Sequence, residues 1–213
     1  MSAQPIRFII MKYKLYAFDF DLTLADTIEV SYDIYGITFA SVGVKFDKKD
    51  VFHHLTRDLT VTFSEIDDGT HDYNKFLQFF IETEVAYFDK VRLYPDVLPT
   101  IKRLKENGAG IALITNRNLE TVARAMEKYG KISDFFDYTV TGDITTHFKP
   151  HPEPILHCLE MAGVNKKDMV YIGDAVNDCK SATAAGVDFI YVNRHGQVDE
   201  PSAIKSLDEI FNE

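Results

Sequence analysis

The chain has 213 residues, a hydrophobic content of 46% and a net charge of −10. This length and composition are sufficient for one core domain with a smaller appendage. The acidic charge argues against a nucleic acid or an anionic membrane as partner, because both would repel the protein. An anionic small molecule can still bind where the site supplies its own cations.

Cysteine use and hydropathy indicate where the protein works. The only two cysteines, Cys158 and Cys179, do not belong to a CxxC pair. Without a disulfide framework, we expect a protein of the reducing cytoplasm. No apolar stretch reaches transmembrane length, and the N-terminus shows no secretory signal, so we expect no membrane partner. We interpret residues 1–12 as an N-terminal tail.

Apolar runs rich in β-branched or aromatic residues predict buried strands over Lys14–Phe20, Gly110–Thr115, Met169–Gly173 and Phe189–Asn193. Apolar residues at helical spacing predict core helices over Asp96–Asn107, Asn118–Tyr129, Pro152–Ala162 and Ala175–Ala185. Alternating strands and helices imply right-handed crossover units. The chain is therefore predicted to form a doubly wound, Rossmann-like parallel sheet of the α/β class.

The segment 27–90 interrupts this alternation and contains no convincing buried strand. Helices are predicted in it over Ile28–Val42, Lys48–Leu55 and Tyr73–Phe88. We interpret residues 27–90 as a helical cap domain inserted after the first strand, with residues 13–26 and 91–213 forming the α/β core. The connections near residues 24–26 and 90–93 are the expected hinges.

Polar side chains follow the predicted strands at their carboxyl ends, where ligands bind in open parallel sheets. Asp19 and Asp21 follow the first strand, and Asp174 follows the third, with Asp178 one helical turn later. The other candidates are the strand-end run Thr115-Asn116-Arg117 and Lys149, which precedes a core helix. One edge of the sheet is thus predicted to gather carboxylates, a hydroxyl and an ammonium.

This set of groups suits phosphoryl transfer. One carboxylate can attack phosphorus and form an aspartyl-phosphate, while a second carboxylic acid protonates the leaving oxygen and later deprotonates water. Clustered carboxylates favour Mg²⁺ as the cofactor, because it prefers oxygen ligands. A hydroxyl and a lysine can hold the charge that develops on the phosphoryl group.

Four motifs in order resemble those of the haloacid dehalogenase superfamily. The DxDx[TV] motif corresponds to Asp19-Phe20-Asp21-Leu22-Thr23, the Ser/Thr motif to Thr115, the lysine motif to Lys149, and GDxxxD to residues 173–178. The resemblance covers residues 15–193, nearly the whole chain. A helical cap between the first and second motifs is similar to that of the phosphoglycolate phosphatase-like branch.

The resemblance implies a role for each motif residue. Asp19 would be the nucleophile and Asp21 the general acid and base, while Thr115 and Lys149 would bind the phosphoryl group. The implied metal ligands are the carboxylates of Asp19 and Asp174 and the backbone carbonyl of Asp21. Asp178 would bind the metal through water or hold Lys149.

Other positions are less directly implicated. Asn116 is a candidate for substrate binding, although capping by Asn118 explains part of this run. Arg57, in a cap segment that reaches the active site in relatives, is a candidate to pair with a carboxylate or a second phosphate; a surface arginine is the alternative. Relatives usually have glycine where this chain has Leu22, a departure expected to alter the local turn without removing a catalytic group.

The resulting prediction is a Mg²⁺-dependent phosphatase that hydrolyses a small phosphorylated metabolite, a phosphomonoester similar to phosphoglycolate, through an aspartyl-phosphate. Alternatives within the superfamily are a β-phosphoglucomutase-like mutase, a nucleotidase and a pyrophosphatase. A non-catalytic binding protein on the same fold is the alternative from another class. The sequence leaves open which ester is the substrate and whether the protein is a monomer or a homodimer.

Overall fold

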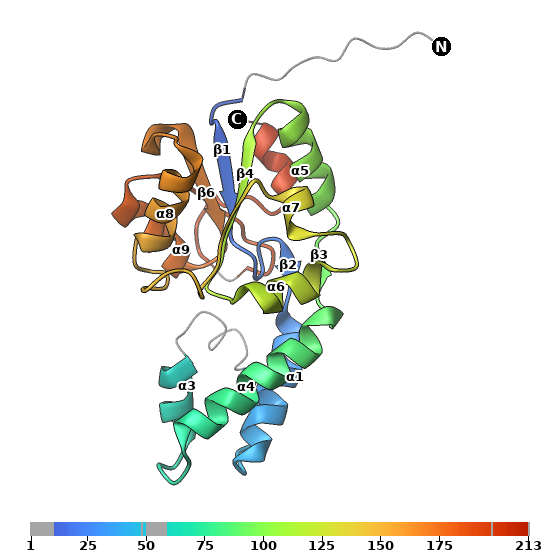
Figure 1. Cartoon of the computed structure of the whole chain (residues 1–213), viewed down its shortest axis with the longest axis vertical. Coiled ribbons are helices and arrows are strands. Elements are labelled where there is room, and N and C mark those ends of the chain that lie inside the picture. The colour runs from blue at the N-terminus through green and yellow to red at the C-terminus, as the bar shows by residue number, and fades with distance from the viewer. Residues whose placement is uncertain (1–10, 48, 50–58, 197, 213) are drawn as a thin grey trace.

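The structure consists of an α/β lobe and a helical lobe, which lies below it in Figure 1. This computed structural model describes residues 11–47, 49, 59–196 and 198–212. Arg57 lies outside these residues, as does nearly all of the helix predicted over Lys48–Leu55. Across the described chain, none of the helices combines the length and apolar character that crossing a bilayer requires.

A five-stranded parallel sheet forms the centre of the α/β lobe. Its strands are ordered β5 (Tyr138–Val140), β4 (Gly110–Ile114), β1 (Leu15–Phe18), β6 (Met169–Gly173) and β7 (Asp188–Tyr191). The central strand β1 is buried along its whole length. The predicted doubly wound parallel α/β fold is confirmed, with β1 between the strands that carry the second and fourth motifs.

Helices cover both faces of the sheet. On one face, α5 (Val97–Glu106) and α6 (Leu119–Met126) share a core with the side chains of Tyr16 and Phe18. On the other face, α8 (Glu153–Ala162) and α9 (Val176–Ala185) share a core with Leu15 and Ala17. Successive residues of a strand point to opposite faces, so the unbroken apolar run of β1 supplies both cores.

Several elements differ from those predicted. The first strand ends at Phe18 rather than Phe20, and α6 ends at Met126 rather than Tyr129. Short elements that were not predicted include α3 (Leu59–Ile66), α7 (Ile132–Phe135), β5 and the 3₁₀ helices η3 (Lys166–Asp168) and η4 (Leu207–Phe211), together with the short elements that join the two lobes. Elements of one or two turns, or three strand residues, contain too few apolar positions to establish a period.

The helical lobe comprises α1 (Ile28–Ser41), α3 and α4 (Tyr73–Tyr87) among the described residues. Its core is aromatic: the ring centroid of Phe76 lies 4.8 Å from that of Phe39 and 4.6 Å from that of Phe63. Offset aromatic pairs at these distances add to the stabilisation that burial provides.

A two-stranded ribbon joins the lobes. The short strands β2 (Ala25–Asp26) and β3 (Arg92–Leu93) pair antiparallel, and the 3₁₀ helix η2 (Phe88–Lys90) leads from α4 into β3. The two chain connections expected as hinges therefore lie side by side. The ribbon places the helical lobe on the side of the sheet at which β1 ends (Figure 1).

Candidate active site

Asp19 occupies the point where β1 ends. Its backbone N–H still donates to the carbonyl of Ile172, at 2.9 Å, so the sheet fixes its position. The chain then turns sharply, and Leu22 takes the left-handed conformation with φ 53°. The turn closes when the Leu22 N–H donates to the Ala25 carbonyl at 2.8 Å. Leucine thus adopts here a conformation that glycine takes more readily, and Asp21 is carried into the cavity below the sheet edge.

Lys149 lies at the centre of a buried polar cluster. Its Nζ atom contacts Asp19 Oδ1, lies 2.7 Å from Asp178 Oδ1, and donates to the hydroxyl of Tyr171 at 2.9 Å. Burial alone would lower the pKa of Lys149, but the carboxylates of Asp178 and Asp19 raise it above its ordinary value. The side chain therefore remains an ammonium, held directly beside the candidate nucleophile.

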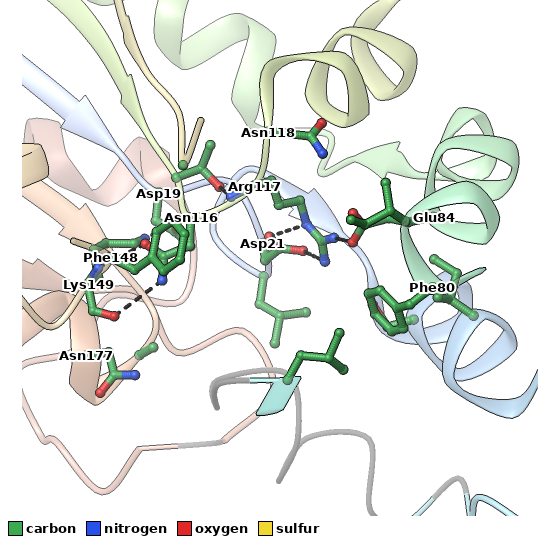
Figure 2. Close-up of a pocket in the computed structure, with 18 of the residues that line it drawn as sticks. Asp19, Asp21, Phe80, Glu84, Asn116, Arg117, Asn118, Phe148, Lys149 and Asn177 are labelled. Atoms are coloured by element: carbon green, nitrogen blue, oxygen red, sulfur yellow. Dashed lines mark hydrogen bonds and ion pairs between the residues drawn. The ribbon is translucent and has the colours of Figure 1, made fainter. Parts of the chain in front are cut away.

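The backbone around Lys149 is held by Asn116. The Lys149 N–H donates to Asn116 Oδ1 at 3.0 Å, and Asn116 Nδ2 donates to the Lys149 carbonyl at 3.3 Å (Figure 2). Both polar groups of the amide thus contact the lysine backbone. Binding of substrate by Asn116 stays a prediction, and the contact that the structure contains is to the loop that presents Lys149.

Asp174 and Asp178 are positioned by the turn between β6 and α9. The Ala175 N–H donates to Asp178 Oδ2 at 3.1 Å, so Asp178 also caps the start of α9. The hydroxyl of Thr23 donates to Asp174 Oδ1 at 3.2 Å. A Cβ atom on Gly173 would lie 2.7 Å from the Asp178 Cβ, so only glycine lets the Asp178 side chain fold back against this turn.

The acids Asp19, Asp174 and Asp178 form a group suited to a divalent cation. One carboxylate oxygen from each lies within 4.8 Å of the others, and all three residues are buried. Burial, with repulsion from Asp178 and Asp19, raises the pKa of Asp174 well above its ordinary value. Burial also raises the pKa of Asp19 to about 7, although Lys149 opposes this shift. The single positive charge of Lys149 does not compensate all the negative charge of these carboxylates. A hard cation that prefers oxygen ligands, such as Mg²⁺, would compensate the rest.

Asp21 faces a different partner. Both of its carboxylate oxygens accept hydrogen bonds from Arg117, which also contacts Glu84 of α4 (Figure 2). Burial alone would raise the pKa of Asp21, but the Arg117 guanidinium lowers it below its ordinary value. Two acids only two residues apart thus differ in environment, Asp19 beside an ammonium and Asp21 beside a guanidinium.

Thr115, at the end of β4, is also buried and lines the same cavity. Its N–H donates to the Val140 carbonyl at 2.9 Å, and its Oγ1 accepts from the Arg117 N–H at 3.2 Å. Among the described residues, no group accepts the proton of this hydroxyl, so it can be donated to a ligand oxygen, as a phosphoryl-binding group requires.

A cavity of about 860 Å³ lies between the two lobes and is lined by the four aspartates described above, Lys149, Thr115, Asn116 and Arg117, whereas Thr23 and Tyr171 are not among its lining residues. The α/β lobe supplies its polar end. The helical lobe supplies mainly apolar and aromatic groups, among them Ile34, Tyr35, Leu77, Phe80 and Ile81, together with the polar side chains of Ser31, Thr60 and Glu84. This volume lies in the range of sites for small metabolites.

The cavity brings together every predicted site residue that the structure describes: Asp19, Asp21, Thr115, Asn116, Arg117, Lys149, Asp174 and Asp178. Arg57 lies outside the described residues. Two participants were not predicted. Tyr171 has no sequence signal beyond being an aromatic residue in a strand, whereas Glu84 could have been singled out as an acid on the apolar side of the helix predicted over Tyr73–Phe88.

Comparison with known proteins agrees with this geometry. The family model for haloacid dehalogenase-like hydrolases matches residues 16–192. Phosphoglycolate phosphatase 1 of Pseudomonas aeruginosa is 34% identical over 119 residues, which span 56% of this chain and 43% of the relative. Pyrophosphatase PpaX of Oceanobacillus iheyensis is 28% identical over 178 residues, spanning 83% of this chain and 82% of the relative.

Solved structures agree on the fold. A provisionally assigned phosphoglycolate phosphatase from Lactobacillus plantarum superposes with a TM-score of 0.85 at 21% identity, covering 95% of this chain and 99% of the other. A sequence identity of 21% supports only a shared fold. The family model, by contrast, matches most of the sequence, including all four motifs. The chain therefore belongs to the haloacid dehalogenase-like hydrolase family, as an enzyme related to its phosphatases.

Proposed function

We propose that this protein is a Mg²⁺-dependent phosphatase that hydrolyses a small phosphomonoester through an aspartyl-phosphate on Asp19. The observation that carries the proposal is the placement of the Lys149 ammonium between Asp19 and Asp178, beside a third buried acid, Asp174. Such a cluster holds a cation and a phosphoryl group against one carboxylate, and it lies at the polar end of a cavity of metabolite size.

In the first step, a carboxylate oxygen of Asp19 attacks phosphorus and the bond from phosphorus to the ester oxygen breaks. Asp21 enters this step in its protonated form, which Arg117 disfavours because it lowers the pKa of Asp21, and gives that proton to the leaving oxygen, so the product departs as an alcohol. Lys149 and the hydroxyl of Thr115 bind the phosphoryl oxygens. Lys149 also keeps Asp19 oriented toward phosphorus, because its Nζ contacts Asp19 Oδ1.

In the second step, a water molecule attacks the phosphorus of the aspartyl-phosphate. Asp21, now a carboxylate, accepts a proton from that water. The bond between phosphorus and Asp19 breaks, which releases inorganic phosphate and restores both acids. Mg²⁺, held by the carboxylates of Asp19 and Asp174 and the backbone carbonyl of Asp21, with Asp178 nearby, would neutralise charge on the phosphoryl oxygens.

The apolar residues that the helical lobe contributes to the cavity would exclude bulk water from the phosphoryl group. The cavity limits substrates to small phosphorylated metabolites, as expected for a phosphomonoester such as phosphoglycolate. A pyrophosphatase activity is the second candidate, favoured by the match to the PpaX pyrophosphatases over 83% of this chain.

A substrate panel tests this proposal. The purified protein is assayed for Mg²⁺-dependent phosphate release from p-nitrophenyl phosphate, phosphoglycolate, sugar phosphates, nucleoside monophosphates and pyrophosphate. Asp19→Asn should lower kcat by about three orders of magnitude or more, as expected when a nucleophile that acts with its partners is removed. Acid quenching should trap phosphate on the wild-type protein and none on this variant.

Asp168→Asn is the matched control, because Asp168 lies just before β6, at the end of that strand opposite Asp174. It should retain wild-type activity. Full activity of Asp19→Asn, or absence of Mg²⁺-dependent hydrolysis across the panel, would contradict the proposal. A higher kcat/KM for pyrophosphate than for any monoester would favour the second candidate.

A further inference from the structure

A chain of hydrogen bonds joins Asp21 to the helical lobe through Arg117 and Glu84. We infer that Arg117 is a positioning residue, which together with Glu84 of α4 fixes the direction of the Asp21 carboxylate and couples it to the cap. This inference rests on the proposed function, in which Asp21 transfers the proton to and from the reacting oxygens. The Arg117 side chain itself need not touch the substrate.

The contact between Arg117 and Asp21 is bidentate. Arg117 Nε donates to Asp21 Oδ2 at 2.7 Å, and Nη2 donates to Oδ1 at 2.8 Å. Two parallel bonds from a planar guanidinium define both the position and the plane of a carboxylate. Phe88 supports the guanidinium from one side, since the Arg117 Cζ lies 4.1 Å from the centroid of its ring.

The remaining terminal nitrogen of the guanidinium points to the cap (Figure 2). Arg117 Nη1 donates to Glu84 Oε1, and the hydroxyl of Thr121, in α6, donates to Glu84 Oε2 at 3.4 Å. The Glu84 side chain is 12% exposed and that of Arg117 is 15% exposed, so neither is a solvated surface group. Burial raises the pKa of Glu84 above its ordinary value, although Arg117 opposes the shift.

The positions of the three residues determine what this series of hydrogen bonds connects. Asp21 follows β1 and Arg117 follows β4, so both belong to the α/β lobe, whereas Glu84 lies in the last turn of α4 in the helical lobe. A displacement of α4 therefore displaces one partner of Arg117 and leaves the other in place. Because misplacement by about 1 Å can cost a catalytic group about 100-fold in rate, this linkage makes proton transfer depend on the position of the cap.

Asp19 has no such link among the contacts that the structure describes, since its partner Lys149 belongs to the α/β lobe. The two catalytic acids are thus held in different ways. The nucleophile is fixed by the core alone, and the proton carrier is fixed jointly by core and cap. Loss of Arg117 should consequently impair proton transfer to the leaving group more than attack on phosphorus.

The test compares kcat/KM for an alkyl phosphate, glycerol phosphate, with kcat/KM for p-nitrophenyl phosphate. An alkoxide needs a proton to leave, whereas nitrophenolate leaves as an anion. Asp21→Asn serves as the reference, with a loss of about 100-fold or more expected on the alkyl ester alone. Arg117→Ala should lower the alkyl value by about 10- to 100-fold and the aryl value by less than about 3-fold.

Further variants separate positioning from folding. Arg117→Lys keeps the charge but cannot form two parallel bonds, so it should lose most of the alkyl activity while folding as the wild type does. Glu84→Ala should give a smaller selective loss and no additional loss in the Arg117→Ala background. Glu82→Ala, on the exposed side of the same helix, and Arg124→Ala, exposed on α6, should behave as the wild type.

Three results would overturn the inference. Equal losses on the alkyl and aryl esters would assign Arg117 a structural role. A raised KM with unchanged kcat on both esters would make it a substrate-binding residue. Arg117→Ala lowering the alkyl activity of Asp21→Asn further would show that it does not act through Asp21. Failure of the proposed function looks different, because Asp19→Asn would then remain active or Asp21→Asn would not distinguish the two esters.

Discussion

The hydroxyl oxygen of Tyr171 accepts a hydrogen bond from the Nζ atom of Lys149, 2.9 Å away. The same hydroxyl lies 3.1 Å from Asp178 Oδ1 and 3.1 Å from the Ile114 carbonyl, and can donate its proton to either. Burial, together with Asp178 and Asp19, raises the pKa of Tyr171 well above its ordinary value, so the phenol stays protonated. A strand residue below the cavity thus holds the active-site ammonium in place.

Replacing Tyr171 by phenylalanine should therefore loosen the hold on Lys149 while the aromatic ring still fills its place in the core. Lys149 would lose one acceptor, and a hydrogen bond from a charged donor contributes about 1.5 kcal/mol or more. We expect kcat for p-nitrophenyl phosphate to fall by about 10-fold or more. Tyr138→Phe, on the edge strand β5 and not among the cavity residues, is the control and should leave kcat unchanged. Equal kcat for Tyr171→Phe and the wild type would show that Asp19 and Asp178 alone position Lys149.

Tyr171 illustrates which part of the site a sequence can predict. Asp19, Asp174 and Lys149 follow or precede regular elements, and their place at one sheet edge follows from the rule that parallel strands end together. Tyr171 lies inside β6, where an aromatic residue packs in the core by default. Its hydroxyl holds Lys149 only because the packing of β6, β1 and β4 in the sheet places it next to that side chain. The periodicity of a strand does not predict such a contact.

The contact between Arg117 and Glu84 was unpredictable for a related reason. The two residues belong to different lobes, and their distance depends on how α4 enters the two-stranded ribbon of β2 and β3. Strands of two residues carry no periodic signal. The long apolar strands and helices of the core, by contrast, specify the fold through burial on both faces of the sheet, and they were predicted correctly in type and order.

Asp174 leads to a prediction about stability and metal binding. Burial raises its pKa well above the ordinary value, which means that the ionised form is unfavourable in the folded, metal-free protein. Asp174→Asn removes that charge and keeps the oxygen that accepts from Thr23. With EDTA present, we expect this variant to melt about 2–4 °C above the wild type, the shift that about 1 kcal/mol produces in a chain of this size.

With Mg²⁺ present, the wild type rather than Asp174→Asn should gain thermal stability. Mg²⁺ binds the folded wild type and should raise its Tm, whereas Asp174→Asn should show little response and no phosphatase activity. Differential scanning fluorimetry with and without Mg²⁺ measures both effects, with Asp168→Asn as the control. An unchanged Mg²⁺ response in Asp174→Asn would remove this residue from the set of ligands.

Asp96 gives a prediction on pH. Its Oδ2 accepts from the Leu207 N–H at 2.6 Å, from the Ser206 hydroxyl at 2.8 Å and from Arg194 Nη2 at 3.0 Å, which ties the C-terminal segment to α5. Burial alone would raise the pKa of Asp96, but these hydrogen bonds lower it below its ordinary value of 3.8. A lowered pKa stabilises the fold above that ordinary value, and the contribution is lost as the pH falls through the folded-state pKa.

Asp96→Asn should accordingly destabilise the protein by about 2 kcal/mol near neutral pH, the size expected for hydrogen bonds to a charged acceptor. The difference from the wild type should shrink progressively once the pH falls below about 4. Urea unfolding at neutral and acidic pH measures it, with Glu106→Gln at the exposed end of α5 as the control. If the difference in unfolding free energy between Asp96→Asn and the wild type did not depend on pH, the shape of the side chain rather than its charge would explain the lost stability.

Leu22 sets backbone strain against burial. Its φ of 53° costs a residue with a Cβ about 1–2 kcal/mol, whereas glycine adopts it freely. The leucine side chain is 2% exposed, and deleting one so buried costs about 2–5 kcal/mol. Burial is the larger effect, so we expect both Leu22→Gly and Leu22→Ala to be less stable than the wild type in urea.

The order of these two variants tests the conformation directly, because they differ only in the Cβ atom. At a left-handed position, Leu22→Gly should be more stable than Leu22→Ala by about 1 kcal/mol. Leu104, fully buried within α5, provides the opposite case: Leu104→Gly should be less stable than Leu104→Ala by about 1 kcal/mol, since glycine weakens a helix. If both positions favoured alanine, Leu22 would not take the left-handed turn that carries Asp21 into the cavity.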